Sequence, residues 1–292
     1  MRSFKDHNPI TVFIFYAFAI IPAMFCTNPV IMCISLVGAV AFRLAKDGSG
    51  AVRKMLPYFA FPVLGVIINP LFNHKGVTTL FILNNNPITL EAVLFGLTLG
   101  IMICSTVIWF SSFNSIMTTD KLLYIFGSVS PKIALILSMT LRYIPLYGQQ
   151  IKKVRQAQTV TGLYKEDNVI DKIRGGLRIM SVMVSWALEN GIITADSMSA
   201  RGYGAGRRSR FAIFSWRKAD IVLAVLCVLL GGTAAACIGI GRLAYTWYPE
   251  IVTPGASLPA VLCYAAYAVL CAIPTVLQIR EEARWRSLQS EI

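Results

Sequence analysis

A polar, basic segment at residues 194–210 carries the side chains most able to do chemistry. It reads TADSMSARGYGAGRRSR and lies between strongly apolar regions. Its arginines are Arg201 and the cluster Arg207, Arg208 and Arg210. Guanidinium groups bind carboxylates and phosphates through paired hydrogen bonds. The part from Asp196 to Gly202 therefore predicts a docking site for a partner outside the apolar part of the chain, whereas Arg207 to Lys218 is interpreted mainly as an anchor at the membrane surface.

Glycines in the same segment resemble a phosphate-binding loop, which would make the chain an ATPase. A Walker A loop has the pattern G-x-x-x-x-G-K-[ST] and lies between a strand and a helix. Here Gly202, Gly204 and Gly206 have the wrong spacing, the lysine is missing, and a helix is expected to precede them. We predict that the chain is not an enzyme and that any ATP-driven work is done by partner subunits.

Cysteine and histidine do not form a recognisable metal or redox pattern. All seven cysteines lie in apolar runs and none forms a C-x-x-C pair, so they are interpreted as small packing residues rather than metal ligands or disulfides. His7 and His74 are far apart in sequence. We therefore expect no metal and no cofactor. A membrane-embedded enzyme would need clustered His, Asp or Glu at the membrane edge, and no such cluster stands out.

The composition is that of a membrane protein. Of 292 residues, 56% are hydrophobic and 14% are charged, whereas soluble domains are about 25% charged. A helix of roughly 20 apolar residues spans the hydrocarbon core, and an open strand would leave its backbone groups unpaired there. The fold class predicted is all-α and polytopic, with about five to six transmembrane helices. Their apolar runs are 9–42 (broken at Thr27-Asn28-Pro29), 57–72, 90–113, 221–241 and 258–279.

Charge predicts the orientation. The chain has 27 Lys+Arg and 14 Asp+Glu, and lysine and arginine gather in cytoplasmic loops. This bias explains the basicity without a nucleic acid partner. It predicts a multi-pass membrane protein with both termini cytoplasmic and outer loops at 73–89 and 242–257. Trp247 and Tyr248 in the second outer loop suit an aromatic belt at the membrane interface. We expect the first apolar helix to be retained rather than cleaved as a signal peptide.

Two further features lie in the apolar runs. Glu91 is interpreted as an interfacial residue at a helix start, although an ionisable group within a membrane is also a functional candidate. Gly96-x-x-x-Gly100 predicts close packing against another helix, most simply within the chain.

The middle of the chain predicts two long helices outside the membrane. The first contains Arg142 and Pro145 and ends near Gly162. The second is capped by Asn168 and runs to about Ser199. Its apolar positions follow helical spacing: Ile170, Ile173, Leu177, Met180, Val184, Ala187 and Leu188. The chain thus divides into N-terminal transmembrane helices (1–131), a cytoplasmic region of two long helices (132–217) and a C-terminal transmembrane pair (218–292).

A set of motifs spread in order along the chain resembles the transmembrane T component of energy-coupling factor (ECF) transporters, the EcfT/CbiQ family. The motifs are His7-Asn8-Pro9, Asn69-Pro70-Leu71-Phe72 with Gly76, Thr89 with Glu91, Thr118-Thr119-Asp120, Leu141-Arg142-Tyr143-Ile144-Pro145, Ala157-Gln158 with Gly162, and Ala195-Asp196-x-Met198-x-Ala200-Arg201-Gly202.

The resemblance implies a mechanism and partners. Family members carry two long cytoplasmic coupling helices, each ending in a short Ala-Arg-Gly-like motif whose arginine docks into a groove on one of two ABC-type ATPase subunits. A small membrane-embedded S component binds the substrate. Carried over to this chain, the second motif is Ala200, Arg201 and Gly202, with Asp196 and Met198 as possible support.

The first motif departs from the family pattern. The matching residues are Ala157, Thr161 and Gly162, so threonine stands where the family has arginine. Either this site couples through packing and neutral hydrogen bonds, or nearby Arg155 substitutes for the missing charge. Coupling to the two ATPases is therefore predicted to be asymmetric.

The function predicted is that of a coupling scaffold in an ECF-type importer for a vitamin or a transition-metal ion. The alternative is a conventional ABC permease subunit that forms its own translocation path. Such a subunit would be expected to show a Glu-Ala-Ala type cytoplasmic loop, which we do not find in the sequence.

Overall fold

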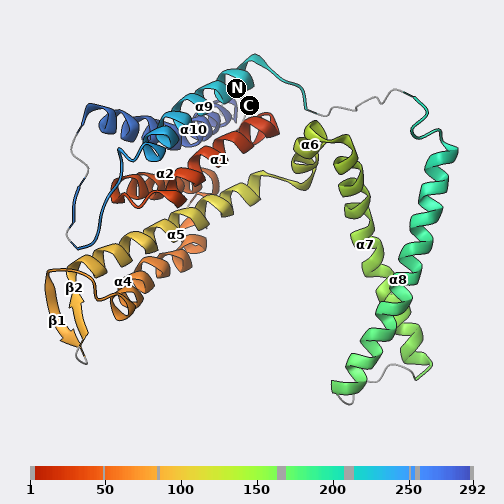
Figure 1. The fold of residues 1–292 in the computed structure, drawn as a ribbon. Helices are drawn as coiled ribbons and strands as arrows, with labels where there is room; N and C mark the ends of the chain where they lie inside the picture. The colour runs from red at the N-terminus through yellow and green to blue at the C-terminus, as the bar shows by residue number, and fades with distance from the viewer. Residues whose placement is uncertain are drawn as a thin grey trace. The chain divides into compact units, whose positions relative to one another are not determined.

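The computed structural model describes residues 4–48, 50–83, 86–162, 169–206, 214–249, 251–253 and 257–289. The chain divides into two compact units, one formed by Met1–Leu122 with Phe214–Ile292 and the other by Leu123–Ile213. Figure 1 shows the helices of each unit. The first unit contains η1 (Phe4–Asp6), α1 (Pro9–Phe25), α2 (Pro29–Asp47), α3 (Gly50–Met55), η2 (Leu56–Phe59), α4 (Ala60–Phe72), β1 (Thr79–Leu83), β2 (Asn86–Thr89), α5 (Leu90–Ile116), α9 (Lys218–Gly239) and α10 (Leu258–Gln289). Helix α6 (Thr119–Val129) leads into the second unit, which contains α7 (Pro131–Val160) and α8 (Val169–Ala200).

Five helical stretches of the described residues are long and apolar enough to cross a membrane. They are Pro29–Asp47, Gly50–Phe72, Leu90–Ile116, Lys218–Gly239 and Leu258–Gln289. Helix α1 is also apolar but has only 17 residues. Helices α7 and α8 have 30 and 32 residues and do not meet the same criterion. The prediction of an all-α polytopic membrane protein with two further long helices is confirmed.

Asparagine–proline pairs set the starts of the first two helices. The side-chain oxygens of Asn8 and Asn28 accept hydrogen bonds from the backbone N–H of Ile10 and Val30, each at 3.0 Å. The proline that follows each asparagine lacks the N–H that a first helical position does not need. The predicted break between the first two helices is therefore confirmed.

An aromatic cluster joins α1, α2 and α5. Trp109 is fully buried, and its ring lies 5.7 Å from that of Phe15 and 6.2 Å from that of Phe42. Its indole Nε1–H donates to Ser35 Oγ at 3.1 Å, which satisfies the only polar atom of the side chain. This cluster forms the centre of the first unit.

Glycines allow α4 and α5 to approach closely. A Cβ on Gly96 would lie 2.2 Å from the carbonyl oxygen of Gly65, and a Cβ on Gly100 would lie 2.4 Å from Cα of Pro62. Asn69 adds a hydrogen bond from Nδ2 to the Ala92 carbonyl at 2.6 Å. The packing role predicted for Gly96 and Gly100 is confirmed, and it lies within the chain.

The loop between α4 and α5 contains a β-hairpin that the sequence did not predict. Strands β1 and β2 pair antiparallel, with Thr79 opposite Thr89. Glu91, in the first turn of α5, accepts hydrogen bonds from the backbone N–H of Thr78 at 3.1 Å and from its hydroxyl. The interpretation of Glu91 as a residue at a helix start is confirmed, and its carboxylate also fixes the end of the hairpin.

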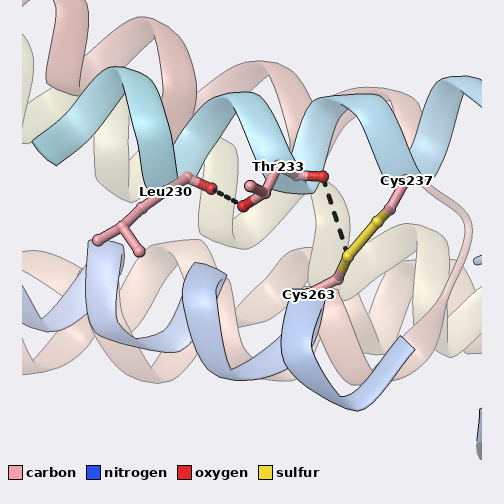
Figure 2. The surroundings of a disulfide bond; sticks show 4 residues. All are labelled: Leu230, Thr233, Cys237 and Cys263. Carbon is pink, nitrogen blue, oxygen red and sulfur yellow. Dashed lines mark hydrogen bonds between the residues drawn. A yellow bond between two sulfur atoms is a disulfide. The ribbon is translucent and has the colours of Figure 1, made fainter. Parts of the chain in front are cut away.

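The interpretation of all seven cysteines as packing residues is wrong for two of them. Figure 2 shows a disulfide between Cys237, near the end of α9, and Cys263, in the second turn of α10. Their Cα atoms are 6.9 Å apart, and they are separated by 26 residues. The Cys263 sulfur lies 3.8 Å from the carbonyl oxygen of Thr233, whose hydroxyl donates to the Leu230 carbonyl (Figure 2). Sequence spacing gave no signal because the pairing depends on two helices lying side by side.

Trp247 also departs from its prediction. Only 6% of its surface is exposed, and its Nε1–H donates to the carbonyl of Thr27 at 3.2 Å. The rings of Tyr245 and Phe95 lie 4.5 and 5.7 Å from its own. Trp247 therefore packs inside the first unit and is not part of a lipid-facing aromatic belt.

Candidate docking sites at two helix ends

Helices α7 and α8 form an antiparallel pair. The hydroxyls of Tyr143 and Thr194 are 2.7 Å apart, and the rings of Tyr147 and Trp186 meet edge to face at 5.3 Å. Because Thr194 donates its own proton to the Asn190 carbonyl, Tyr143 is the donor to Thr194. At 1.5 Å per residue, the two C-terminal ends lie roughly 24 and 16 Å from this crossing in opposite directions along the pair.

The end of α8 carries the second predicted motif. The backbone N–H of Gly202 donates to the Ser199 carbonyl, and that of Tyr203 donates to the Met198 carbonyl, both at 3.0 Å. Gly202 has φ of 74°, a conformation that glycine adopts without strain. These bonds make a Schellman motif in which Arg201 is the C-cap residue. The predicted helix end at Gly202 is confirmed.

The end of α7 has the same local geometry. Thr161 is the C-cap residue, and Gly162 follows it with φ of 70°. The N–H of Gly162 donates to the Thr159 carbonyl at 3.0 Å. Thr161 and Arg201 therefore occupy equivalent positions at two separate helix ends. The predicted helix end at Gly162 is confirmed as well.

The side chains of the two cap residues differ in charge and in hydrogen bonding. Thr161 turns its hydroxyl back onto its own helix, where it lies 3.0 Å from the Ala157 carbonyl and 3.2 Å from the Gln158 carbonyl. Arg201 is exposed and carries a positive charge, which the negative end of the helix dipole favours. The structure thus places a charged group at one helix end and an internally bonded hydroxyl at the other.

Arg155, the predicted substitute for the missing arginine, lies in the helix that Thr161 caps but not at the cap position. It is exposed and lies six residues before Thr161, which is about 9 Å along the helix axis. Its side chain therefore starts more than one turn away from the cap position.

The supporting residues of the second motif fall on different sides of α8. Met198 is partly buried and lines a groove with Arg201, whereas Asp196 is exposed and does not line it. Ala200 and Ala157 are exposed at the two helix ends, where their small side chains leave the backbone accessible.

One polar cluster in the first unit was missed by sequence reasoning. His7 Nδ1 lies 2.6 Å from Asp220 Oδ1, and both side chains are almost buried. The same carboxylate accepts from the backbone N–H of Asn8 at 3.3 Å and of Arg217 at 3.2 Å. Thr11 Oγ1 donates to the Asp220 carbonyl. This cluster, which we call the His7–Asp220 latch, fixes the start of α1 to the start of α9. The signals in the sequence were the His7-Asn8-Pro9 motif and, far from it, an acidic residue, Asp220, at the start of an apolar run.

These features define an all-α, multi-pass membrane protein with a long antiparallel helix pair that ends in two equivalent caps. Comparison with known proteins gives the family. Residues 2–213 match the family model of CbiQ, cobalt transport protein, and the chain belongs to this family of energy-coupling factor transporter transmembrane proteins.

Relatives named energy-coupling factor transporter transmembrane protein EcfT occur in several bacteria. The protein from Streptococcus equi is 27% identical over 190 residues, which cover 58% of this chain and 69% of the relative. That from Exiguobacterium sibiricum is 27% identical over 248 residues, covering 78% of this chain and 92% of the relative. EcfT 1 of Listeria monocytogenes is 30% identical over 138 residues, covering 44% of this chain and 52% of the relative. The last match thus spans about half the length of the relative.

Proposed function

We propose that the chain is the coupling scaffold of an ECF-type importer. It transmits ATP-driven motion from two ABC-type ATPase subunits to a membrane-embedded S component that binds the substrate. The cargo class is a micronutrient, either a vitamin or a transition-metal ion. The scaffold lies in the plasma membrane of a prokaryote with both termini in the cytoplasm.

The observation that carries this proposal is the pair of equivalent caps at the ends of α7 and α8. Each helix stops in a glycine with positive φ, and each exposes one cap residue, Thr161 or Arg201. Because the ends point in opposite directions along an antiparallel pair, two separate subunits can each receive one. A permease that formed its own path would not need two such ends.

The surface of α7 and α8 supports a role in a larger complex. Most large apolar side chains of both helices are exposed, including Ile144, Leu177 and Leu188 at 60%, 62% and 66%. Contiguous exposed apolar surface marks contacts with other proteins or with lipid. The S component and the membrane are the partners proposed for this surface.

Co-purification tests the proposal. The chain, carrying an affinity tag, is co-expressed with the two ATPase subunits and the S component of the same organism and purified in mild detergent. We expect both ATPases to be retained and Arg201→Ala to weaken retention of one of them. Failure of any ATPase to co-purify, under conditions in which a known ECF complex survives, would refute the proposal.

A further inference from the structure

A groove of about 350 Å³ lies between α7 and the end of α8. Helix α7 contributes Ser138, Met139 and Arg142 to it. Helix α8 and its cap contribute Thr194, Ser197 and Arg201 on one helical face, together with apolar neighbours. The groove therefore brings together Arg142 and the cap residue Arg201, which are 59 positions apart in the sequence.

The walls of the groove are joined to each other. The Tyr143–Thr194 hydrogen bond joins its two sides, and Thr194 itself lines the hollow. The Arg142 guanidinium carbon lies 5.5 Å from the centre of the Tyr143 ring, within the range of a cation–π contact. Arg142 is thus held against the residue that ties the two helices together.

The charge in the groove is positive and unbalanced. Among the described residues the ion pairs are formed by His7, Arg43 and Lys54, none of which belongs to α7 or α8. Asp196 precedes Ser197 by one position, so it lies about 100° round the helix from it and does not line the groove. Two guanidinium groups that share a hollow without a carboxylate repel each other, and an added anion relieves that repulsion.

We propose that Arg142 and Arg201 together form a two-arginine receptor for an acidic side chain of an ATPase subunit, so that both helices contribute to one docking site. This inference rests on the function proposed above and assigns Arg142 a role in it. A carboxylate accepts paired hydrogen bonds from guanidinium groups, and the hydroxyls of Ser138 and Ser197 add further donors.

The lining favours a protein segment over a free phosphate ion. Met139, Ile193 and Met198 contribute apolar surface beside the two arginines. An amphipathic segment with one acidic residue flanked by apolar ones matches both parts of this lining. A free phosphate ion matches only the charged part, and a lipid is an outcome that the crosslinking test below separates from a protein segment.

Binding measurements on the complex test the pairing. The full chain in lipid nanodiscs is titrated with the purified ATPase subunits, using Arg142→Gln, Arg201→Gln and the double variant. Arg174→Gln is the matched control, because Arg174 is an exposed arginine of α8 that does not line the groove. We expect each groove variant to weaken binding about tenfold, and the double variant to weaken it by less than the product of the two losses, since the arginines share one ligand.

The outcomes separate this inference from the proposed function. If Arg201→Gln weakens binding while Arg142→Gln behaves as Arg174→Gln does, the two-arginine receptor is refuted and the coupling role stands. If neither variant weakens binding, the two-arginine receptor and the docking role of Arg201 are refuted, whereas loss of ATPase binding by the unmodified chain would refute the proposed function itself.

Photo-crosslinking identifies the occupant of the groove. In one variant, Met139→benzoylphenylalanine places a photo-crosslinking side chain in the groove. In the control variant, Ile173→benzoylphenylalanine places it outside the groove. Capture of an ATPase subunit from the first position supports the inference. Capture of lipid alone from an ATPase-containing complex overturns it in favour of a headgroup site.

Discussion

The His7–Asp220 latch predicts a large loss of stability from a small change. Asp220→Asn keeps the size of the side chain but replaces one acceptor oxygen with an NH₂ group. In the native protein Oδ1 accepts from His7 and Asn8, and Oδ2 accepts from the Arg217 N–H. An amide cannot satisfy both sides. Its NH₂ group must face either His7 and the Asn8 N–H or the Arg217 N–H, and an NH₂ group cannot accept a hydrogen bond from an N–H donor.

The magnitude follows from these contacts. Hydrogen bonds to charged groups contribute about 1.5–3 kcal/mol each. Loss of one such bond, with weakening of the others, predicts about 2–4 kcal/mol of destabilisation. For chains of this size each kcal/mol shifts Tm by roughly 2–4 °C, so Asp220→Asn should lower the thermal unfolding temperature by roughly 5–15 °C. The assay is thermal unfolding of the purified chain in detergent, followed by tryptophan fluorescence.

Two comparisons make the prediction sharp. Glu189→Gln is the matched control, because Glu189 is an exposed carboxylate of α8 and its loss should change stability by less than about 0.5 kcal/mol. His7→Ala combined with Asp220→Asn should cost less than the sum of the single changes, since both remove the same contact. Strict additivity, or an Asp220→Asn protein as stable as the Glu189→Gln control, would refute the latch as a stabilising unit.

Three further predictions address other parts of the chain. Gly96→Leu should separate α4 from α5 and strongly reduce the yield of folded protein, because even a Cβ would lie 2.2 Å from a backbone oxygen; normal yield and a normal elution profile in size-exclusion chromatography would contradict the close packing. Cys237 and Cys263 should be protected from a maleimide reagent until a reductant is added, and each should become reactive after Cys→Ser replacement of the other; labelling of both in the untreated protein would show that the disulfide is absent. Thr161→Arg should increase the affinity of the complex for an ATPase subunit by roughly 1.5–3 kcal/mol, in the range of a charge-assisted hydrogen bond; unchanged affinity in the titration would mean that this helix end does not contact an acidic groove.

Local features of the fold could be predicted from the sequence. The break at Asn28-Pro29 and the helix ends at Gly162 and Gly202 depend on a few neighbouring residues, because caps and positive φ angles are set by local backbone geometry. The apolar runs predict the spanning helices in the same way. These are the features that the structure confirms.

Contacts between distant residues could not be predicted. His7 and Asp220 are separated by 213 residues, and no spacing rule links them. The same holds for the burial of Trp247 and for the disulfide, both of which require knowledge of which helices lie side by side. The groove shared by Arg142 and Arg201 also depends on the crossing of two helices. The sequence identified the two motifs that contain these arginines but did not place them together.

Helix α9 is secured at both of its ends by bonds of different kinds. At its start Asp220 is joined to the first residues of α1, and near its end Cys237 is covalently joined to α10. Because α9 is held at both ends, it can neither rotate about its axis nor slide along its neighbours without breaking one of these two contacts. Helices α7 and α8 are joined at their crossing by a hydroxyl pair and a ring contact. Helix α9 is therefore held by one polar and one covalent contact, whereas α7 and α8 are joined at their crossing by non-covalent contacts.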